Sequence, residues 1–308
     1  MQHSKGGRQR HWGAIHFKVS NTVHEEPYPI DRPALYVVAT PIGNLRDLTP
    51  RAQAVLAGAD LIAAEDTRVT GQLLKHFGID TRMMSLREHN EREAAEKLIA
   101  RLAEGQAVAQ VSDAGTPAVS DPGARLVAAV HAAGYKVVPI PGASALLAAL
   151  AGAGMQSPRF QFHGFPEPKS GARRKEFETL KDLPHTIAFF EAPHRIAESL
   201  ADMAEVFGPD RVAVVCRELT KTFETLRRAP LAELASWVAA DSNQQRGELV
   251  VLVESAPEQA ADDAASFDSV LAPLVRELPM KQAVKLAAEI TGGNRNALYE
   301  RALQLKGD

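Results

Sequence analysis

Residues 35–45, LYVVATPIGNL, decide the fold of this 308-residue chain. Residues 35–39 form a short apolar run, which is typical of a strand buried in a sheet. The run leads directly into a loop that contains Pro41 and Gly43. Such a loop exposes backbone N–H and C=O groups, and glycine lets a ligand approach them closely.

Short apolar runs alternate with helical patterns as far as residue 150. The further runs are 61–64, 107–111 and 136–140, and the helical patterns cover 50–57, 91–104, 121–133 and 143–150. Strands that alternate with helices predict a largely parallel sheet covered on both faces. The fold class is therefore α/β, and residues 34–152 are expected to form the N-terminal domain.

A second α/β domain is expected over residues 153–256, after a hinge at 152–158. Its predicted strands are 160–164, 186–190, 212–216, 222–227 and 248–253, and its predicted helices are 173–181, 193–207 and 231–240. Two strands follow each other closely after Arg211, so this sheet is expected to be mixed rather than all parallel.

The two ends of the chain differ from these domains. Residues 1–33 lack a periodic apolar pattern and are interpreted as a flexible extension without a function; the spacing of its four histidines fits no metal site. Residues 257–308 are expected to form an acidic linker and a small helical domain. That domain is predicted as a helix-turn-helix-like pair with one apolar stripe on each helix: Val284, Ala287 and Ala288, then Leu298, Ala302 and Leu305.

The composition is that of an ordinary globular protein with a formal net charge of -3, so bulk charge does not indicate a nucleic-acid partner. A single cysteine, Cys216, excludes a disulfide framework and a cysteine-based zinc cluster, and no metal site is expected. A cytoplasmic setting is the simplest interpretation. The charge-free stretch 137–158 is broken by proline and glycine, so no membrane span is expected.

Standard nucleotide and hydrolase motifs are absent: the sequence has no GxGxxG after the first strand, no GxxxxGK[ST], no HExxH and no GxSxG. Instead, Pro/Gly-rich loops at 39–45, 112–123 and 139–144 follow predicted strands, where open α/β sheets bind ligands. They suit a ligand recognised by its polar edges. The alternatives are structural: Asp121 followed by Pro122 can simply cap a helix, and residues 141–142 can be a plain turn.

Charged residues also gather after strands of the second half. Glu191, His194 and Arg195 lie in one such loop, and Glu218 and Lys221 lie in another. A solvated surface turn is the alternative for both loops, although packed strand ends rarely carry so many ionisable groups without partners. Residues 65–68 have the same character, and residues 87–90, which include His89, can also be only a helix start.

The loops resemble those of the tetrapyrrole methylase superfamily. The segments that carry the resemblance are 39–48 (ATPIGNLRDL), 64–68 (AEDTR), 112–123 (SDAGTPAVSDPG), 141–144 (PGAS), 191–195 (EAPHR) and 217–221 (RELTK). Within that superfamily they are similar to the bacterial 16S ribosomal RNA 2'-O-ribose cytidine methyltransferases. The resemblance covers residues 35–305 in the same order.

This resemblance implies a homodimer of two-domain subunits that bind S-adenosylmethionine in the cleft between the domains. It also implies that the C-terminal helical pair is a small extra domain of this branch, which favours RNA as the substrate. By the same likeness, ten residues would contact the cofactor: Pro41, Gly43, Asp113, Gly115, Thr116, Pro117, Ser144, Ala145, Gly247 and Glu248.

The implied reaction methylates 16S ribosomal RNA of the small ribosomal subunit, at a single-stranded or distorted element. Catalysis is then chiefly alignment of the ribose oxygen with the methyl donor, assisted by a base. The candidate bases are Glu191, which is favoured, and His194, Glu218 and His89. The candidate RNA-binding cations are Arg68, Arg195, Lys221, Arg173 and Arg174.

A net charge of -3 conflicts with a phosphate-rich substrate, so we expect the cleft to be basic and the acidic residues to lie elsewhere. Two other hypotheses remain. A tetrapyrrole methyltransferase would need a roomy apolar trough with carboxylate-binding arginines. A non-catalytic RNA-binding ribosome-assembly factor would depend on its tail and tolerate changes in the cofactor loops.

Overall fold

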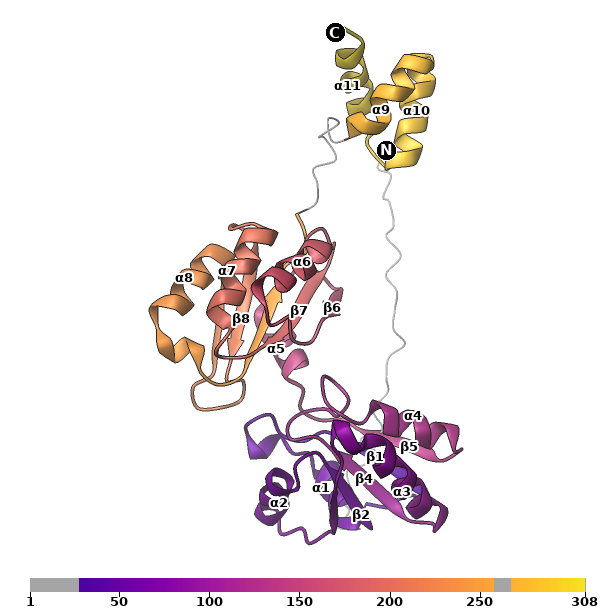
Figure 1. Ribbon diagram of the computed structural model, residues 1–308, viewed down its shortest axis with the longest axis vertical. Helices are drawn as coiled ribbons and strands as arrows, with labels where there is room; N and C mark the ends of the chain where they lie inside the picture. Colours follow the sequence, from indigo (N-terminus) through magenta and orange to yellow (C-terminus); the bar gives the residue numbers. More distant parts are fainter. Residues whose placement is uncertain (1–27, 258–266, 308) are drawn as a thin grey trace, which may run out of the picture.

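The computed structural model describes residues 28–257 and 267–307 (Figure 1). The four histidines of the expected extension lie outside the described residues, as do Glu258, Asp262 and Asp263 of the expected linker. Asp268, the fourth acidic residue of that linker, is described and lies at the start of a helix. Residues 28–33 are described, and they contact the first domain: Arg32 forms an ion pair with Asp60, and the partly buried Ile30 packs against the core. The expectation that the extension runs as far as residue 33 is therefore wrong, because these side chains have partners on the domain surface.

The first domain is built on a parallel sheet in the order β3-β2-β4-β1-β5. Its strands are β1 (Ala34–Val38), β2 (Leu61–Ala64), β3 (Met83–Ser85), β4 (Ala107–Val111) and β5 (Lys136–Ile140). Four of them were predicted. β3 is a three-residue strand at the edge of the sheet, too short for an alternating pattern to reveal it.

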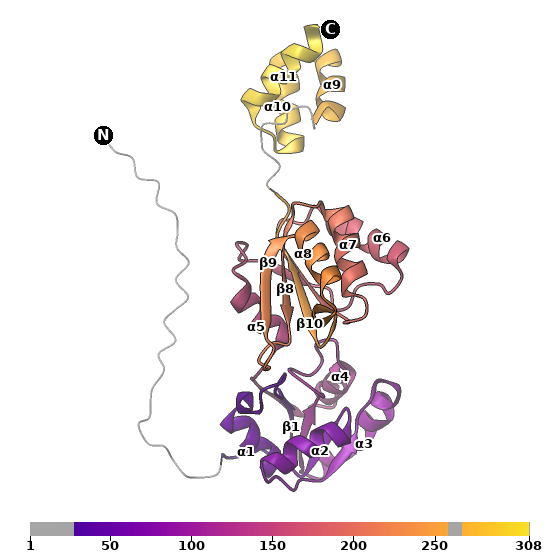
Figure 2. The same ribbon diagram turned by 90° about the vertical axis from the view of Figure 1, so that its left-hand side faces the viewer.

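Helices cover both faces of this sheet, as predicted (Figure 2). Alternate residues of β1 point to opposite faces, so Tyr36 packs with α1 (Pro50–Gly58) and α2 (Thr67–His76), whereas Leu35 packs with α3 (Glu91–Ala103) and α4 (Ala124–Ala132). α2 was not predicted. It begins within the charged segment 65–68, where the Asp66 carboxylate accepts the backbone N–H of Arg68 and caps the helix.

The second domain has a mixed sheet in the order β6-β7-β10-β8-β9, which confirms the prediction. Its strands are β6 (Phe160–Phe162), β7 (Thr186–Glu191), β8 (Val212–Arg217), β9 (Thr225–Pro230) and β10 (Leu249–Val253). Only β6 and β7 pair in parallel. One face packs against α6 (Ser170–Leu180), α7 (Ile196–Phe207) and α8 (Leu231–Ala240).

The opposite face of this sheet is covered by α5 (Ala145–Ala153). Leu146, Ala149 and Ala153 of this helix pack with Val214 of β8 and with neighbouring strands. Packing therefore assigns α5 to the second domain, although the expected boundary at residue 152 assigned it to the first. Gly152 lies inside the helix, and the chain crosses between the domains before α5, at residues 141–144.

The C-terminal part has its own small core, built from α9 (Asp268–Glu277), α10 (Met280–Thr291) and α11 (Arg295–Gly307). Both predicted apolar stripes lie in this core or pack against it. The prediction of a helical pair missed a third helix. α9 occupies part of the segment interpreted as a linker and adds Leu271 and Val275 to the core.

α4 begins three residues later than predicted, which changes the role of Asp121. The helix begins at Ala124, after Gly123 at φ +124°, and not at Asp121. Its free backbone N–H groups are capped by the buried carboxylate of Glu91, whose Oε1 accepts from Gly123 and Arg125 at 3.0 Å and from Leu126 at 3.3 Å. The cap thus comes from another helix, which leaves Asp121 without a capping role.

We expect Glu91→Ala to destabilise α4, because three backbone donors, two of them buried, would lose their acceptor at a cost of about 1–3 kcal/mol. Amide hydrogen exchange of residues 123–132 should become faster. The control is Glu93→Ala, which removes an exposed carboxylate of the same helix that forms an ion pair with Lys97. Equal protection of α4 in the two variants would contradict the proposed cap.

Candidate functional site

Loops at the carboxyl ends of the first sheet are hydrogen-bonded to one another. Thr40 and Gly115 exchange two backbone hydrogen bonds of 2.9 and 3.1 Å. The Thr116 hydroxyl donates to the carbonyl oxygen of Ala143 at 3.1 Å. The predicted Pro/Gly-rich loops therefore form one connected surface, with Gly115 at φ +79°, a backbone conformation that favours glycine.

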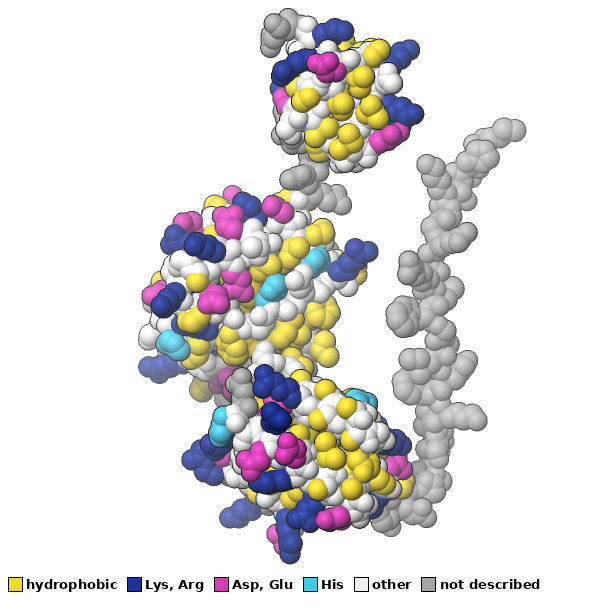
Figure 3. Space-filling model, turned by 45° about the vertical axis from the view of Figure 1, so that its right-hand side comes forward, with side chains coloured by type: hydrophobic (Ala, Val, Ile, Leu, Met, Phe, Trp, Pro, Cys, Tyr) yellow, Lys and Arg dark blue, Asp and Glu magenta, His cyan; other side chains and the backbone are white. Residues whose placement is uncertain are grey.

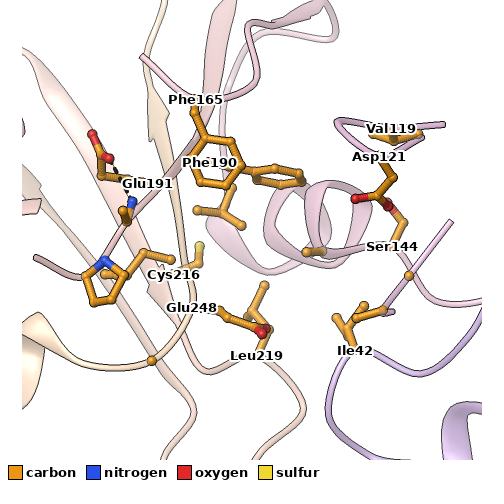
Figure 4. A pocket seen from close by; sticks show the side chains of 18 of the residues that line it. Ile42, Val119, Asp121, Ser144, Phe165, Phe190, Glu191, Cys216, Leu219 and Glu248 are labelled. Atoms are coloured by element: carbon orange, nitrogen blue, oxygen red, sulfur yellow. Dashed lines mark hydrogen bonds between the residues drawn. The ribbon is translucent and has the colours of Figure 1, made fainter. Parts of the chain in front are cut away.

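An interdomain cleft of about 400 Å³ lies between this surface and the second domain (Figure 4). The first domain and α5 contribute Ile42, Gly115, Thr116, Asp121, Ser144 and Ala145. The second domain contributes Phe165, Phe190, Glu191, Cys216, Leu219, Gly247 and Glu248. Much of the wall is apolar, and a cavity of this size is typical of sites for small organic ligands.

The charged residues that line the interdomain cleft are all acidic: Asp121, Glu191 and Glu248. No lysine or arginine lines it among the residues that the structure describes. The expectation of a basic cleft is therefore wrong, because strand-end carboxylates of both domains converge here. On the face shown in Figure 3, basic and acidic side chains are intermixed and form no continuous basic field.

Six of the ten predicted cofactor residues line the cleft: Gly115, Thr116, Ser144, Ala145, Gly247 and Glu248. Pro41, Gly43 and Asp113 line an adjoining hollow, whose wall also includes Lys221 and Glu248. Pro117 is buried beneath the loop. Asp113 has a loop-organising role, since its Oδ1 accepts the backbone N–H of Asp66 at 2.9 Å and so connects the ends of β4 and β2.

Asp121 was predicted to lie in the ligand-binding loop 112–123, with a plain helix cap as the alternative. The structure shows that its carboxyl group lines the cleft beside Ser144 (Figure 4). Partial burial and the nearby charges of Glu65 and Asp113 raise the pKa of Asp121 to about 6, although a hydrogen bond with Ser112 acts in the opposite direction. A carboxyl with such a pKa can exchange a proton near neutral pH.

Glu191 ends β7 and is 2% exposed. Its Oε1 accepts from the backbone N–H of Ala192 at 2.7 Å and pairs with Arg195 at 2.9 Å, whereas its Oε2 is buried and has no hydrogen-bond partner among the described residues. Figure 4 shows this carboxylate at the edge of the cleft, far from Asp121 and Ser144. Arg195 is therefore not a free phosphate-binding cation, because it is largely buried against Glu191.

Glu218 supports the loop at residues 247–248. Its Oε1 accepts the backbone N–H of Glu248 at 3.0 Å and the Nζ of Lys221 at 2.8 Å. Burial alone would raise the pKa of Glu218, but the hydrogen bonds from Lys221 and Glu248 outweigh burial and lower it. These contacts engage Glu218 in holding the cleft wall, which argues against its predicted role as a base.

The other predicted bases lie outside the cleft. His194 is exposed after β7. His89 is exposed in a polar hollow on the first domain, which is lined by Glu65, Asp66, Arg87, His89, Glu91, Asp113, Ser120, Asp121, Gly123 and Arg125. This polar hollow and the interdomain cleft meet at Asp121.

Arg173 was predicted to bind RNA, and the structure contradicts this role. Its side chain is fully buried, and its guanidinium pairs with Asp202 of α7 at 2.5 Å. Arg174 is half-exposed and pairs with both Asp202 and Glu205. Arg68 is 83% exposed and pairs with Asp66, and Lys221 bridges Glu218 and Glu248.

Backbone strain marks the loops beside the cleft. The non-glycine residues with positive φ in the described structure are Ala118 (67°), Ser120 (64°), Glu218 (51°) and Thr220 (67°). Such conformations are costly and concentrate at functional sites. No local pattern predicts these conformations, since none of the four residues is a glycine or an asparagine. The apolar wall residues Phe165 and Leu219 were likewise not predicted.

Among the described residues, no group of three or more His, Cys, Asp or Glu side chains is arranged to hold a metal ion. No helix of the described chain is long and apolar enough to cross a membrane.

Comparison with known families supports the interpretation of these loops. A family model described as tetrapyrrole (corrin/porphyrin) methylases matches residues 34–235. A second model, described as the RsmI C-terminal HTH domain, matches residues 260–306.

Curated relatives extend over nearly the whole chain. The ribosomal RNA small subunit methyltransferase I of Pseudomonas aeruginosa is 55% identical over 275 residues, which are 89% of this chain and 98% of that protein. The protein of the same name from Escherichia coli O157:H7 is 50% identical over 273 residues, 89% of this chain and 96% of that protein.

Solved structures show the same fold at low identity. The cobalt precorrin-4 methyltransferase CbiF superposes with a TM-score of 0.56 at 18% identity, over 72% of this chain and 94% of that one. Diphthine synthase gives a TM-score of 0.56 at 18% identity, over 72% and 90%. The chain therefore belongs to the tetrapyrrole methylase family and, within it, to the branch of ribosomal RNA small subunit methyltransferase I. The predicted family and α/β fold are confirmed.

We expect Arg173→Ala to lower the free energy of unfolding by about 3 kcal/mol, because it leaves the buried carboxylate of Asp202 with fewer donors. Arg174→Ala, at the half-exposed neighbour, should cost about 1 kcal/mol or less. Urea unfolding followed by the fluorescence of Trp237, in the same domain, measures both. Equal stability of the two variants would contradict the structural role of Arg173.

Proposed function

We propose that this chain transfers a methyl group from S-adenosylmethionine to the 2'-oxygen of a cytidine ribose in the decoding region of 16S ribosomal RNA. The observation that carries the proposal is the interdomain cleft, with an apolar wall and three acidic residues and without a lysine or arginine among its described lining. Such a cleft suits a small cationic ligand. The names of the relatives supply the class of acceptor.

The residues of the cleft fit S-adenosylmethionine. That molecule carries positive charges on its sulfonium and ammonium groups, which the carboxylates of Asp121 and Glu248 attract more strongly in a partly apolar cavity than in water. The carboxylate of Glu191 is already paired with Arg195. Its adenine requires an apolar slot and exposed backbone groups. Leu219 and Val250 offer the apolar surface, and the loop at Gly115 offers the backbone.

We assign cofactor binding to the predicted residues that line the cleft, with Pro41, Gly43 and Asp113 acting from the adjoining hollow. When bound, S-adenosylmethionine supplies a methyl group that is already a good electrophile. The protein therefore has to align the acceptor oxygen, exclude water and accept a proton. Phe165 and Phe190, in edge contact at 5.7 Å between ring centroids, form the apolar wall that excludes water.

A tetrapyrrole acceptor fits this cleft poorly. Tetrapyrrole precursors such as uroporphyrinogens are rich in carboxylates, and a site for them needs arginines. Arg195 is paired with Glu191, and the cleft presents Asp121 and Glu248 as well. These like charges would repel such a substrate.

Ribosomal RNA in the small subunit is the proposed acceptor, reached in the cytoplasm by a homodimer of this chain. Relatives at 50–55% identity are named for that substrate, and the match to a C-terminal HTH domain supports nucleic-acid contact by the tail. Arg68 and Lys221 remain the proposed phosphate contacts beside the cleft. Their pairing with acidic residues means that RNA must displace or share these partners.

The deciding experiment is methyl transfer from labelled S-adenosylmethionine to small ribosomal subunits that lack the modification, followed by nuclease digestion and mass analysis. We expect one new 2'-O-methylcytidine. A matched reaction with fully modified subunits controls for unspecific labelling.

Other outcomes would redirect the proposal. Cofactor binding without transfer to the subunit would indicate a small-molecule acceptor. Specific binding of the subunit without any affinity for the cofactor would indicate a non-catalytic assembly factor.

Gly247→Ala should weaken binding of S-adenosylmethionine about tenfold, which corresponds to about 1.4 kcal/mol. Gly247 has φ +81°, and an added Cβ would lie 2.3 Å from the Glu218 carboxylate that holds this loop. The matched control is Gly134→Ala, at φ +79° with nothing within 4 Å of the added carbon. Both variants carry the same backbone strain, so equal cofactor affinities by calorimetry would contradict the assignment of Gly247 to the site.

A further inference from the structure

Asp121 stands between two cavities. Of the residues that the structure describes, it alone lines both the interdomain cleft and the polar hollow, whose volume is about 630 Å³. The cleft holds the proposed cofactor residues, whereas the polar hollow opens on the first domain beside Arg87, His89 and Arg125. A group at this shared wall can contact a molecule in each cavity.

The backbone before Asp121 is held in a costly conformation. Ala118 and Ser120 adopt left-handed φ values of 67° and 64°, which side chains with a Cβ rarely do. No helix cap requires this geometry, because Glu91 caps α4. The strained turn at residues 118–120 directs the Asp121 carboxyl into the cleft.

The other carboxylates of the polar hollow already hold backbone amides. Glu65 accepts the N–H of Asp113, Asp66 accepts that of Arg68, and Asp113 accepts that of Asp66. Glu91 accepts three N–H groups of α4. Asp121 accepts no backbone amide within the described structure, and the Ser112 hydroxyl lies beside it. Its carboxylate therefore retains the capacity to accept from a bound molecule.

The outer side of the polar hollow is positively charged, in contrast to the carboxylates of its inner side. Arg87 and Arg125 are exposed, and neither forms an ion pair with any residue that the structure describes. Guanidinium groups bind phosphate oxygens in a bidentate manner. A ribose flanked by phosphates matches this arrangement, with its hydroxyl at the inner carboxylate and its phosphates at the outer arginines.

We propose that the acceptor ribose enters through the polar hollow and that Asp121 accepts the proton of its 2'-hydroxyl during methyl transfer. This inference rests on the proposed function. The bond between the ribose oxygen and the methyl carbon forms while the carbon–sulfur bond breaks. The sulfur keeps the electron pair of the broken bond, and the hydroxyl proton passes to the Asp121 carboxylate.

Asp121 is a better acceptor than Glu191 on geometric grounds. The unpaired Oε2 of Glu191 is buried, and its Oε1 is engaged by Arg195 and Ala192. Neither oxygen is presented to a ribose that enters from the polar hollow, whose described lining includes Asp121 but not Glu191.

The proposal predicts a pH dependence whose direction follows from the charges around Asp121. Those facing it are Glu65, Asp113, Glu91, Arg87, His89 and Arg125 of its own domain, and Glu191 and Glu248 across the cleft. Burial, Glu65 and Asp113 raise the pKa of Asp121 to about 6. Only the ionised carboxylate accepts a proton, so the transfer rate should rise with pH through about 6 and then level off.

The test is single-turnover transfer to unmodified small subunits by the wild type and by Asp121→Asn, with cofactor and RNA saturating. We expect the variant to bind both ligands with affinities within about threefold of the wild type. Its rate should fall about 100-fold or more, and the rise through pH 6 should disappear. Glu93→Gln, which neutralises an exposed carboxylate of α3, is the matched control and should retain the wild-type profile.

Several results would overturn the inference. One is a rate for Asp121→Asn within threefold of the wild type. Another is an acidic limb that persists in Asp121→Asn but disappears in Glu191→Gln or His89→Gln. If Asp121→Asn fails to bind the cofactor, Asp121→Glu, which keeps a carboxylate, is tested instead. This variant should bind the cofactor and transfer the methyl group, with the rise of the rate shifted to another pH. Binding without transfer would contradict the proposal. Failure of the wild type to methylate the subunit overturns the proposed function, and this inference with it.

Discussion

The site depends on hydrogen bonds that lock the strand-end loops of the first domain together. The pair between Thr40 and Gly115 joins the loop after β1 to the loop after β4, and the Thr116 hydroxyl adds the loop after β5. Irregular loops alone would lose much conformational entropy on binding a ligand. Because these bonds form on folding, the cleft is shaped before any ligand arrives, and binding does not have to order it.

The second constraint is electrostatic. Carboxylates gather at the strand ends of both domains, yet most of them are engaged by backbone amides or cations, as Asp113 and Glu218 illustrate. Burying such groups without partners would be costly. Asp121 and the exposed part of Glu248 are the exceptions that face the cleft. The net charge of -3 is thus compatible with a nucleic-acid substrate only if the cations act locally, as Arg87 and Arg125 can at the outer side of the polar hollow.

Sequence reasoning was most accurate where local pattern determines structure. The bounds of β2, β4, β5 and α8 match the predicted ranges, because apolar runs between turn residues specify buried elements. Predictions from local pattern were wrong where a residue distant in the sequence determines how a segment is capped or buried. Asp121 followed by Pro122 looks like a helix start, but Glu91, thirty positions earlier in the chain, caps α4. Arg173 looks like a surface cation, but Asp202 from another helix buries it. The apolar cleft wall carried no signal because it forms only when the domains meet.

The two halves of the cleft are connected by α5. Its N-cap, Ser144, accepts the backbone N–H of Leu147 and lies in the loop surface of the first domain, whereas the body of the helix packs on the second sheet (Figure 1). A shift of the second domain would therefore pull on the loop that Thr116 holds through Ala143. This connection makes the width of the cleft a property of the packed interior rather than of a flexible hinge, since well-packed cores transmit displacement instead of absorbing it. An acceptor that enters through the polar hollow needs no opening between the domains, because that hollow lies wholly on the first domain.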